Sequence, residues 1–245
     1  MRDRATAFVI LRRPRLGIGP LVRRSFGRLE RLISELYRRF FVDLGELVDS
    51  IRAHIYSPAT ILEIGSGDGM VTERIVHTFP DAAVPGIDIC AHPGRLYRGT
   101  RSHVRFLRTT TQELAAAEPA RYQLVIIADV LHPIPYSEWT FFLSASHRLM
   151  ADGGTLVIKD WVRQRTVAYL LGYLSDRYVT GEPIRYPHER ELRTLAKETF
   201  GANSVEAEFR VSPWNCNLHA RDCAVPLSGE PQRGRSIRAH GLASC

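Results

Sequence analysis

Three glycines at alternate positions follow a short apolar run and are the most informative chemical feature of the sequence. Gly65, Gly67 and Gly69 come directly after residues 61–64 and directly before a segment that can form a helix. Glycine has no Cβ, so it adopts a positive φ at little cost and lets backbone N–H groups approach a ligand closely. These N–H groups and the positive end of the helix dipole face whatever lies above the strand, which predicts a ligand site there. Met70 stands where a dinucleotide fingerprint needs its third glycine, so the pattern disfavours NAD.

An acidic residue follows about 20 residues beyond the glycines. Residues 84–89 are the next expected strand, and Asp88 stands where a carboxylate can accept both ribose hydroxyls of an adenosine ligand. The sequence ILEIGSGDG followed by GIDI resembles the S-adenosylmethionine site of class I methyltransferases. The resemblance implies that the following residues bind this cofactor: Glu63, Gly65, Ser66, Gly67, Asp68, Gly69, Asp88 and Ile89. The alternative is a glycine turn in an ordinary α/β domain, with Asp88 as a solvated strand end.

The segment after the third expected strand departs from the family pattern. Family members commonly place an acid just beyond that strand, here residues 104–107, to bind the adenine amino group. This sequence has Thr109, Thr110, Thr111 and Gln112 there instead. A hydroxyl or an amide can still bond the adenine edge, so Thr110 and Thr111 are the predicted contacts.

The most strand-like run, residues 122–128, leads into residues 129–135, which read DVLHPIP. Ligands of open α/β folds bind at the carboxyl ends of the strands, which is where this segment lies. It resembles the D-x-L-H-H-I-P motif of bacterial small-molecule methyltransferases of the ubiquinone-biosynthesis type (types 11 and 12), with Pro133 in place of the second His. The resemblance implies that Asp129 and Val130 contact the cofactor. The segment differs from the N/D-P-P-Y motif of enzymes that methylate nucleic acids or protein glutamine.

Two residues are candidates for catalysis. The unperturbed pKa and the location of His132 suit a general base for a hydroxyl acceptor, and the alternative is a hydrogen-bonded histidine that shapes the pocket wall. Lys159 ends the expected strand 155–159, where its ammonium can orient an acidic substrate on which Trp161 stacks. The alternative for Lys159 is a solvated ion pair with Asp160.

Aromatic residues after this strand are candidates for the acceptor pocket. The order of a K-D strand end, an aromatic-rich helix, a G-x-x-I-x-Y link and an E-L-x-x-L helix resembles a bacterial subgroup of these methyltransferases. In that subgroup the inserted helices, here residues 165–200, border the acceptor pocket. The resemblance implies that the following residues line it: Trp161, Tyr169, Tyr173 and Tyr186. Packing in the hydrophobic core is the alternative for any aromatic stripe.

The elements that must position these residues alternate between strands and helices, which predicts an α/β fold. We expect strands at 61–64, 84–89, 104–107, 122–128, 155–159, 204–211 and 215–221, and helices at 25–54 (one or two), 71–79, 137–150, 165–178 and 188–200. Apolar residues recur at helical spacing in 25–54, so these helices should pack beside the first strand. The resemblance implies a three-layer α/β/α Rossmann-like sandwich with N-terminal helices and a mostly parallel seven-stranded sheet whose last strand is antiparallel.

One domain is expected between two polar ends. Residues 29–224 should form the methyltransferase domain, with an N-terminal helical cap at 29–56 and the inserted helices at 165–200. Residues 1–28 are Arg-rich and fit a flexible basic arm, an interfacial anchor drawn to anionic lipid, or an organelle presequence. The Pro, Gly, Ser and Arg content of residues 225–245 predicts a disordered tail.

Composition narrows the class of protein. No apolar run approaches the roughly 20 residues of a membrane-spanning helix. Four cysteines are too few for a disulfide framework, which favours a cytoplasmic protein, peripheral to the membrane at most through weak contact of the basic arm with anionic lipid. Cys216, His219 and Cys223 lack a second ligand cluster, so no metal is expected. The net charge of +7 comes with no aromatic-interleaved basic motif, so nucleic acid is not the expected partner.

The predicted reaction is an in-line displacement on the sulfonium methyl of S-adenosylmethionine. It gives a methylated small-molecule or lipid-like acceptor and S-adenosylhomocysteine. Three alternatives stay open: a nicotinamide oxidoreductase on the same scaffold, a catalytically inactive S-adenosylmethionine-binding regulatory protein, and an RNA methyltransferase guided by the Arg-rich arm. The oligomeric state also stays open.

Overall fold

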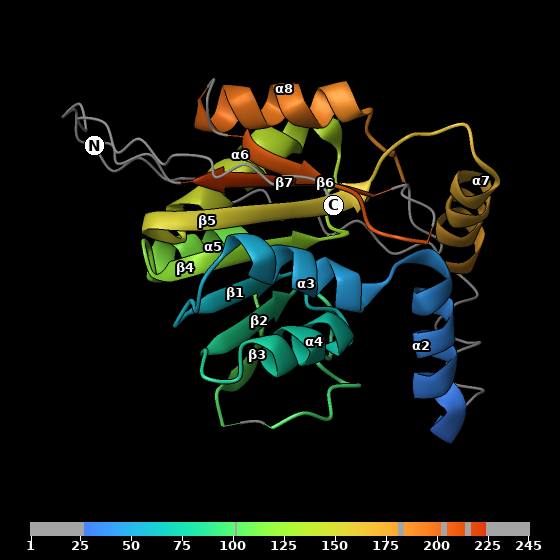
Figure 1. Cartoon of the computed structure of the whole chain (residues 1–245), viewed down its shortest axis with the longest axis horizontal. Coiled ribbons are helices and arrows are strands. Elements are labelled where there is room, and N and C mark those ends of the chain that lie inside the picture. The colour runs from blue at the N-terminus through green and yellow to red at the C-terminus, as the bar shows by residue number, and fades with distance from the viewer. Residues whose placement is uncertain (1–26, 101, 181–183, 202–204, 214–216, 224–245) are drawn as a thin grey trace, which may run out of the picture.

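A single twisted sheet with helices on both faces organises the chain (Figure 1). The computed structural model describes residues 27–100, 102–180, 184–201, 205–213 and 217–223. The strands follow the spatial order β3-β2-β1-β4-β5-β7-β6, and the neighbours from β3 to β5 are parallel, whereas β7 is antiparallel to both β5 and β6. The bounds are β1 (Ile61–Ile64), β2 (Val84–Asp88), β3 (Val104–Arg108), β4 (Tyr122–Ala128), β5 (Met150–Trp161), β6 (Val205–Phe209) and β7 (Asn217–Cys223). The predicted Rossmann-like fold with a mostly parallel sheet is confirmed.

Helices form the two outer layers. Their bounds are η1 (Gly27–Leu29), α2 (Glu30–Phe41), α3 (Leu44–His54), α4 (Met70–Thr78), α5 (Thr111–Ala117), α6 (Tyr136–Arg148), α7 (Val167–Leu174), the π-helical turn η2 (Ser175–Thr180) and α8 (Glu189–Phe200). Helices α3 and α4 pack on one face of the sheet, while α5, α6 and α8 pack on the other. None of the helices in these ranges is long and apolar enough to cross a membrane.

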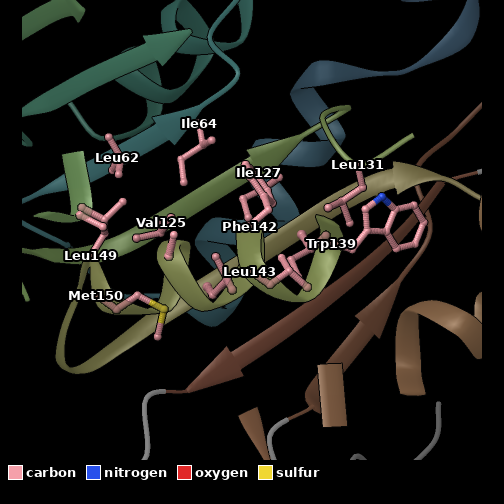
Figure 2. Close-up of a cluster of buried hydrophobic side chains, with 14 of the residues drawn as sticks. Leu62, Ile64, Val125, Ile127, Leu131, Trp139, Phe142, Leu143, Leu149 and Met150 are labelled. Carbon is pink, nitrogen blue, oxygen red and sulfur yellow. The ribbon is translucent and has the colours of Figure 1, made fainter. Parts of the chain in front are cut away.

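The two central strands supply side chains to both layers. Successive residues of a strand point to opposite faces, so Ile61 and Ile126 join the cluster under α3 and α4, whereas Leu62 and Ile127 join the cluster under α5 and α6. Figure 2 shows the second cluster, in which Trp139 of α6 is completely buried against the sheet. A strand buried on both faces reads as a continuous apolar run, which is why the sequence pattern located β1 and β4 well.

One helix and the start of one strand are the main differences from the sequence prediction. Helix α5 was not predicted, although its first turn carries a capping box in which Thr110 accepts from the N–H of Glu113 and the Glu113 side chain accepts from the N–H of Thr110. Strand β5 begins at Met150 rather than at 155, and the register with β4 shifts between Tyr122 and Leu124 before regular pairing starts.

The predicted packing of the N-terminal helices is right for α3 and wrong for α2. Leu47, Val48 and Ile51 of α3 are buried against the sheet. Leu32 and Leu36 of α2 are more than half exposed. The apolar residues of α2 do recur at helical spacing, but Leu32 and Leu36 lie on the outer side of the helix.

Candidate functional site

Backbone hydrogen bonds fix the glycine loop between β1 and α4 to the neighbouring strand. The N–H groups of Gly65 and Ser66 both donate to the carbonyl of Ile87, at 2.8 and 3.0 Å. The N–H of Gly67 donates to Asp88 Oδ2 at 2.8 Å. The loop and the end of β2 therefore form one ledge at the carboxyl edge of the sheet.

Two of the loop glycines are required for different reasons. Gly65 has a φ of 81°, and a Cβ there would lie 2.2 Å from Val130 Cγ2, so the close approach of the β4 end excludes any side chain. Gly67 has a φ of 50°, and a Cβ there would meet only the carbonyl oxygen of Gly65, at 3.9 Å. The space beside Gly67 is open, and the amino end of α4 begins at Met70 next to it. Such an arrangement suits a polar ligand group.

Asp88 is partly exposed at the end of β2, where the sequence predicted a ribose contact. One carboxylate oxygen accepts from Gly67, and the other accepts from the N–H of Cys90 at 2.8 Å. Each carboxylate oxygen has a second lone pair, so Asp88 can accept two further hydrogen bonds from a diol. Ile89 follows it with its side chain 74% exposed, as a contact with a flat ring requires.

Glu63 lies completely buried beneath the loop, at 0% exposure. The hydroxyl of Thr72 in α4 donates to Oε2, while Oε1 has no hydrogen-bond partner among the described residues, and neither has the buried Oγ of Ser66. Burial raises the pKa of Glu63 to about 7, although the Thr72 hydrogen bond and the charge of Arg38 oppose the shift. A buried carboxyl with an unused acceptor under the ledge favours a cationic group nearby.

We expect Glu63→Gln to remove a pH-dependent cost in stability. A carboxyl with a pKa of about 7 when folded and 4.5 as the reference value binds more protons in the folded state, so the free energy of unfolding falls as the pH rises from 4.5 to about 7. This pKa shift lowers the free energy of unfolding at high pH by roughly 3 kcal/mol at most. Urea unfolding at pH 5 and pH 8 should show Glu63→Gln gaining on the wild type by roughly that amount at the higher pH. An equal pH dependence of both proteins would contradict the assignment, since all other carboxylates are shared.

The other predicted cofactor residues around the loop are already engaged in the protein. Both oxygens of Asp68 accept from Arg38 Nη2 of α2, each at 2.8 Å. Thr110 caps α5, and Thr111 is buried in its first turn. The N–H of Thr109 donates to the carbonyl of Asp88 at 3.2 Å, which places this threonine segment next to the ledge.

An ion pair between a buried lysine and a partly exposed aspartate joins the ends of β4 and β5. Lys159 is 1% exposed in its side chain, and its Nζ donates to both oxygens of Asp129. Asp129 itself has a φ of 59°, in the left-handed region that is uncommon outside glycine. Lys159 was expected to face either an acidic substrate or Asp160 in water. It is instead buried, and its partner is Asp129.

Asp160, which the sequence analysis treated only as a partner for Lys159, holds His132. Its carboxylate is fully buried and accepts from the backbone N–H groups of Leu131, His132 and Trp161, at 2.7, 3.2 and 2.7 Å. Its Oδ1 also lies 2.7 Å from His132 Nδ1. Since a carboxylate accepts, this contact fixes the ring with a proton on Nδ1 and leaves Nε2 as the nitrogen that can accept a proton.

His132 Nε2 lies 3.8 Å from Oδ2 of Asp176, which is beyond hydrogen-bond distance. Burial disfavours the charged imidazole, but the carboxylates of Asp160, Asp129 and Asp176 outweigh it and raise the pKa of His132 to about 9. Burial also raises the pKa of Asp176, while the Tyr186 hydrogen bond and His132 oppose that shift. Asp176 was missed in the sequence because an acid in the turn after an aromatic helix has no distinctive spacing.

Aromatic rings surround Tyr186 next to these charges. The Tyr186 hydroxyl donates to Asp176 Oδ2 at 2.5 Å. The centroid of its ring lies 5.4, 6.0, 5.5 and 6.3 Å from those of His132, Trp161, Tyr169 and Tyr173, respectively. The structure therefore brings together all four residues predicted to line the acceptor pocket.

One group of side chains has the composition of a metal site. Ligand atoms of Asp129, His132 and Asp160 lie within 4.8 Å of one another. Lys159 occupies both oxygens of Asp129, however, and His132 Nδ1 is bonded to Asp160, so the geometry is that of paired charges. Cys216, part of the spacing considered in the sequence, lies outside the described residues.

Comparison with known sequences identifies similar proteins. The profile of a family described as "Methyltransferase domain" matches residues 29–207. The chain is 24% identical over 161 residues to a ubiquinone biosynthesis O-methyltransferase of Saccharophagus degradans, over 64% of this chain and 61% of that protein. It is 27% identical over 123 residues to the protein of the same name from Azotobacter vinelandii, over 49% and 51% of the two chains. The chain therefore spans less than two thirds of the length of these relatives.

Solved structures share the fold at low sequence identity. The 1,6-didemethyltoxoflavin-N1-methyltransferase of Burkholderia thailandensis, solved with 1,6-didemethyltoxoflavin and S-adenosylhomocysteine, superposes with a TM-score of 0.58 and 18% identity, covering 84% of this chain and 88% of that chain. The magnesium protoporphyrin IX methyltransferase of Synechocystis, with bound S-adenosylhomocysteine, gives a TM-score of 0.57 and 17% identity, covering 84% and 99%. At these identities the likeness establishes the fold.

Proposed function

We propose, on the premise that this chain belongs to the methyltransferase domain family, that it transfers the methyl group of S-adenosylmethionine to a small-molecule acceptor. The observation that carries the proposal is the ledge at Gly67, where open space adjoins a carboxylate at the end of β2. When bound, S-adenosylmethionine supplies an electrophilic methyl group on a sulfonium. The described chain supplies the groups that hold it and the groups that prepare the acceptor.

The ledge fits this cofactor in three respects. Asp88 keeps acceptor capacity for the ribose hydroxyls, and Ile89 offers an exposed apolar side chain for the adenine ring. Gly67 leaves room for the amino-acid end above bare backbone. The buried carboxyl of Glu63, whose pKa burial raises to about 7, has an unused acceptor oxygen below the ledge, and a ligand with an ammonium and a sulfonium would favour its charged form. Thr110 and Thr111 would lie beside the adenine edge.

His132 is the residue proposed to take a proton from a hydroxyl or amine acceptor. Asp160 fixes the orientation of the ring and leaves Nε2, which lies 3.8 Å from Asp176 Oδ2, as the nitrogen that can accept a proton. A pKa of about 9 makes the imidazole charged at neutral pH, so only a small neutral fraction acts there. Lys159 is proposed as a positioning residue, because its ammonium is committed to Asp129.

The aromatic cluster supports an acceptor with apolar surface. Tyr169 and Tyr173 are half-buried beside Tyr186 and Trp161, so they can cover a ring or an alkyl chain near His132. Ordering the acceptor in such an environment and excluding water supplies most of the rate in a direct in-line displacement.

Two measurements test the proposal. Calorimetry should show that the protein binds S-adenosylmethionine and S-adenosylhomocysteine. Incubation with a methyl-labelled donor and a cell extract of metabolites and lipids, followed by mass spectrometry, should show a labelled small molecule. Binding without any labelled product would support the regulatory alternative, and label in RNA with salt-dependent RNA binding would support the RNA methyltransferase. Absence of binding would overturn the proposal.

A further inference from the structure

Helix α2 is attached to the rest of the protein through the charged residues of its inner side and through Phe41 at its carboxyl end, whose ring packs on Trp161. Arg31 pairs with Glu73 of α4 at 2.6 Å, and Arg38 pairs with Asp68 of the glycine loop at 2.8 Å. Just before Arg31, Glu30 pairs with Arg95 at 2.5 Å. Amphipathic surface helices normally bury their apolar stripe, and α2 is turned the other way.

The apolar stripe of α2 faces outward. It consists of residues spaced three and four apart, which share one side of a helix: Leu29, Leu32, Leu36 and Phe40. Each of these side chains is at least 46% exposed.

Helix α7 and the turn η2 carry a second exposed stripe. Tyr169 and Tyr173 point inward to Tyr186, as their ring contacts show. The opposite side of the segment exposes Val167, Leu170, Leu171, Leu174 and Tyr178, each by at least 40%. Figure 1 shows α2 and α7 at the same end of the molecule, toward which β5 runs.

These nine side chains, which we call the α2–α7 face, are the majority of the large hydrophobic side chains that the described residues expose. Thirteen large hydrophobic side chains are exposed in the described ranges, and only four lie elsewhere: Tyr56, Ile89, Tyr136 and Phe141. Exposed apolar side chains that gather in this way mark an interaction site.

The charge of the chain indicates the partner. Residues 1–26 contain seven arginines and one aspartate, a balance of +6 within a net charge of +7 for the whole chain. This segment joins directly to η1 and α2, so its attachment point lies at the α2–α7 face. An apolar face next to a strongly basic segment fits an anionic bilayer surface. A second copy of the chain would bring the same positive charge and repel it.

We propose that the α2–α7 face lies on the surface of an anionic lipid bilayer, with the carboxyl edge of the sheet turned toward the lipid. Leucine side chains from both helices enter the interface, and the positive charge that residues 1–26 add to the chain favours anionic over neutral lipid. The inference does not rest on methyl transfer, and it goes beyond it by naming the surface on which the protein works.

Sedimentation with sucrose-loaded vesicles tests the proposal. The wild-type chain should bind vesicles that contain phosphatidylglycerol and phosphatidylcholine, and should bind pure phosphatidylcholine vesicles weakly. Leu170→Asp with Leu174→Asp, and separately Leu32→Asp with Leu36→Asp, should each lower binding at least about tenfold. Phe141→Asp is the matched control, because Phe141 is 62% exposed on α6, and it should bind as the wild type does.

Thermal unfolding and gel filtration of all four proteins complete the test. Unchanged melting temperatures would show that lost binding is not lost folding. Equal binding to neutral and anionic vesicles, or equal loss in the Phe141→Asp control, would overturn the proposal. So would a wild-type dimer without vesicle binding that Leu170→Asp with Leu174→Asp converts to a monomer, since the face would then join two copies.

Discussion

Replacing Asp88 by Ala is expected to weaken the binding of S-adenosylhomocysteine about 1000-fold in calorimetry. Two hydrogen bonds from the ribose hydroxyls to an ionised acceptor contribute about 2 kcal/mol each, and both are lost at once. The substitution also removes the acceptor that holds the N–H of Gly67, so the ledge loses its fixed geometry. The sheet itself does not depend on this carboxylate, because Gly65 and Ser66 remain bonded to Ile87.

Asp81→Ala is the matched control, since Asp81 is an exposed aspartate that lies shortly before the first residue of β2, at the end of the strand opposite to Asp88. It should bind S-adenosylhomocysteine with the wild-type affinity. Gly67→Arg tests the same ledge in a second way, because it keeps the Asp88 carboxylate but places a side chain in the open space, at a φ that strains any residue other than glycine. Wild-type affinity in both Asp88→Ala and Gly67→Arg, with folding intact, would place the cofactor elsewhere.

His132→Ala is expected to lower kcat for a hydroxyl or amine acceptor by roughly 10²- to 10⁴-fold, the usual contribution of a general base. Binding of S-adenosylhomocysteine should stay within about twofold of wild type, because His132 lies on the acceptor side. Asp160 keeps three backbone donors in the variant, so the end of β5 should hold its shape. Full activity of His132→Ala would show that His132 is not a general base and only shapes the wall of the pocket.

The pH profile separates His132 from Asp176 as the proton acceptor. The folded-state pKa of His132 is raised to about 9, so the imidazole is charged below that pH and neutral above it. The rate should therefore rise about tenfold per pH unit up to about 9 and then level off. Asp176→Asn removes one of the charges that raise this pKa, so the plateau should begin at lower pH, whereas the exposed Asp152→Asn should leave the profile unchanged. A plateau reached well below pH 7 in the wild type would assign the proton to Asp176.

The geometry of the glycine ledge could be predicted because its parts are close in sequence. The loop glycines and Asp88 belong to one strand, loop, helix and strand, and the φ values of Gly65, Gly67 and Gly69 are those that only glycine adopts easily. The charge network around His132 could not be predicted in the same way. Lys159 and Asp129 are 30 residues apart, and which carboxylate pairs with the ammonium depends on the register of β4 with β5.

Helix α2 shows a second limit of sequence patterns. Its period correctly indicates one apolar and one charged side, but a period does not say which side is buried. The answer depends on Glu73, Asp68 and Arg95, which are distant in sequence and offer charged partners to the inner side of the helix. Asp176 illustrates the same point, because only the fold brings it to His132 and Tyr186.

The ion pairs that hold α2 have a consequence for how fast a ligand can enter and leave the ledge. Partly exposed guanidinium–carboxylate contacts contribute at most about 1 kcal/mol each, and dissolved ions screen them further. Three such ion pairs hold residues 30–38 of α2, one of them on Asp68 in the glycine loop, so this part of the helix can detach and reseat while Phe41 stays packed on Trp161. We therefore expect S-adenosylhomocysteine to exchange for S-adenosylmethionine faster as the salt concentration rises. The gain should end at the salt concentration at which binding of S-adenosylmethionine itself becomes weaker.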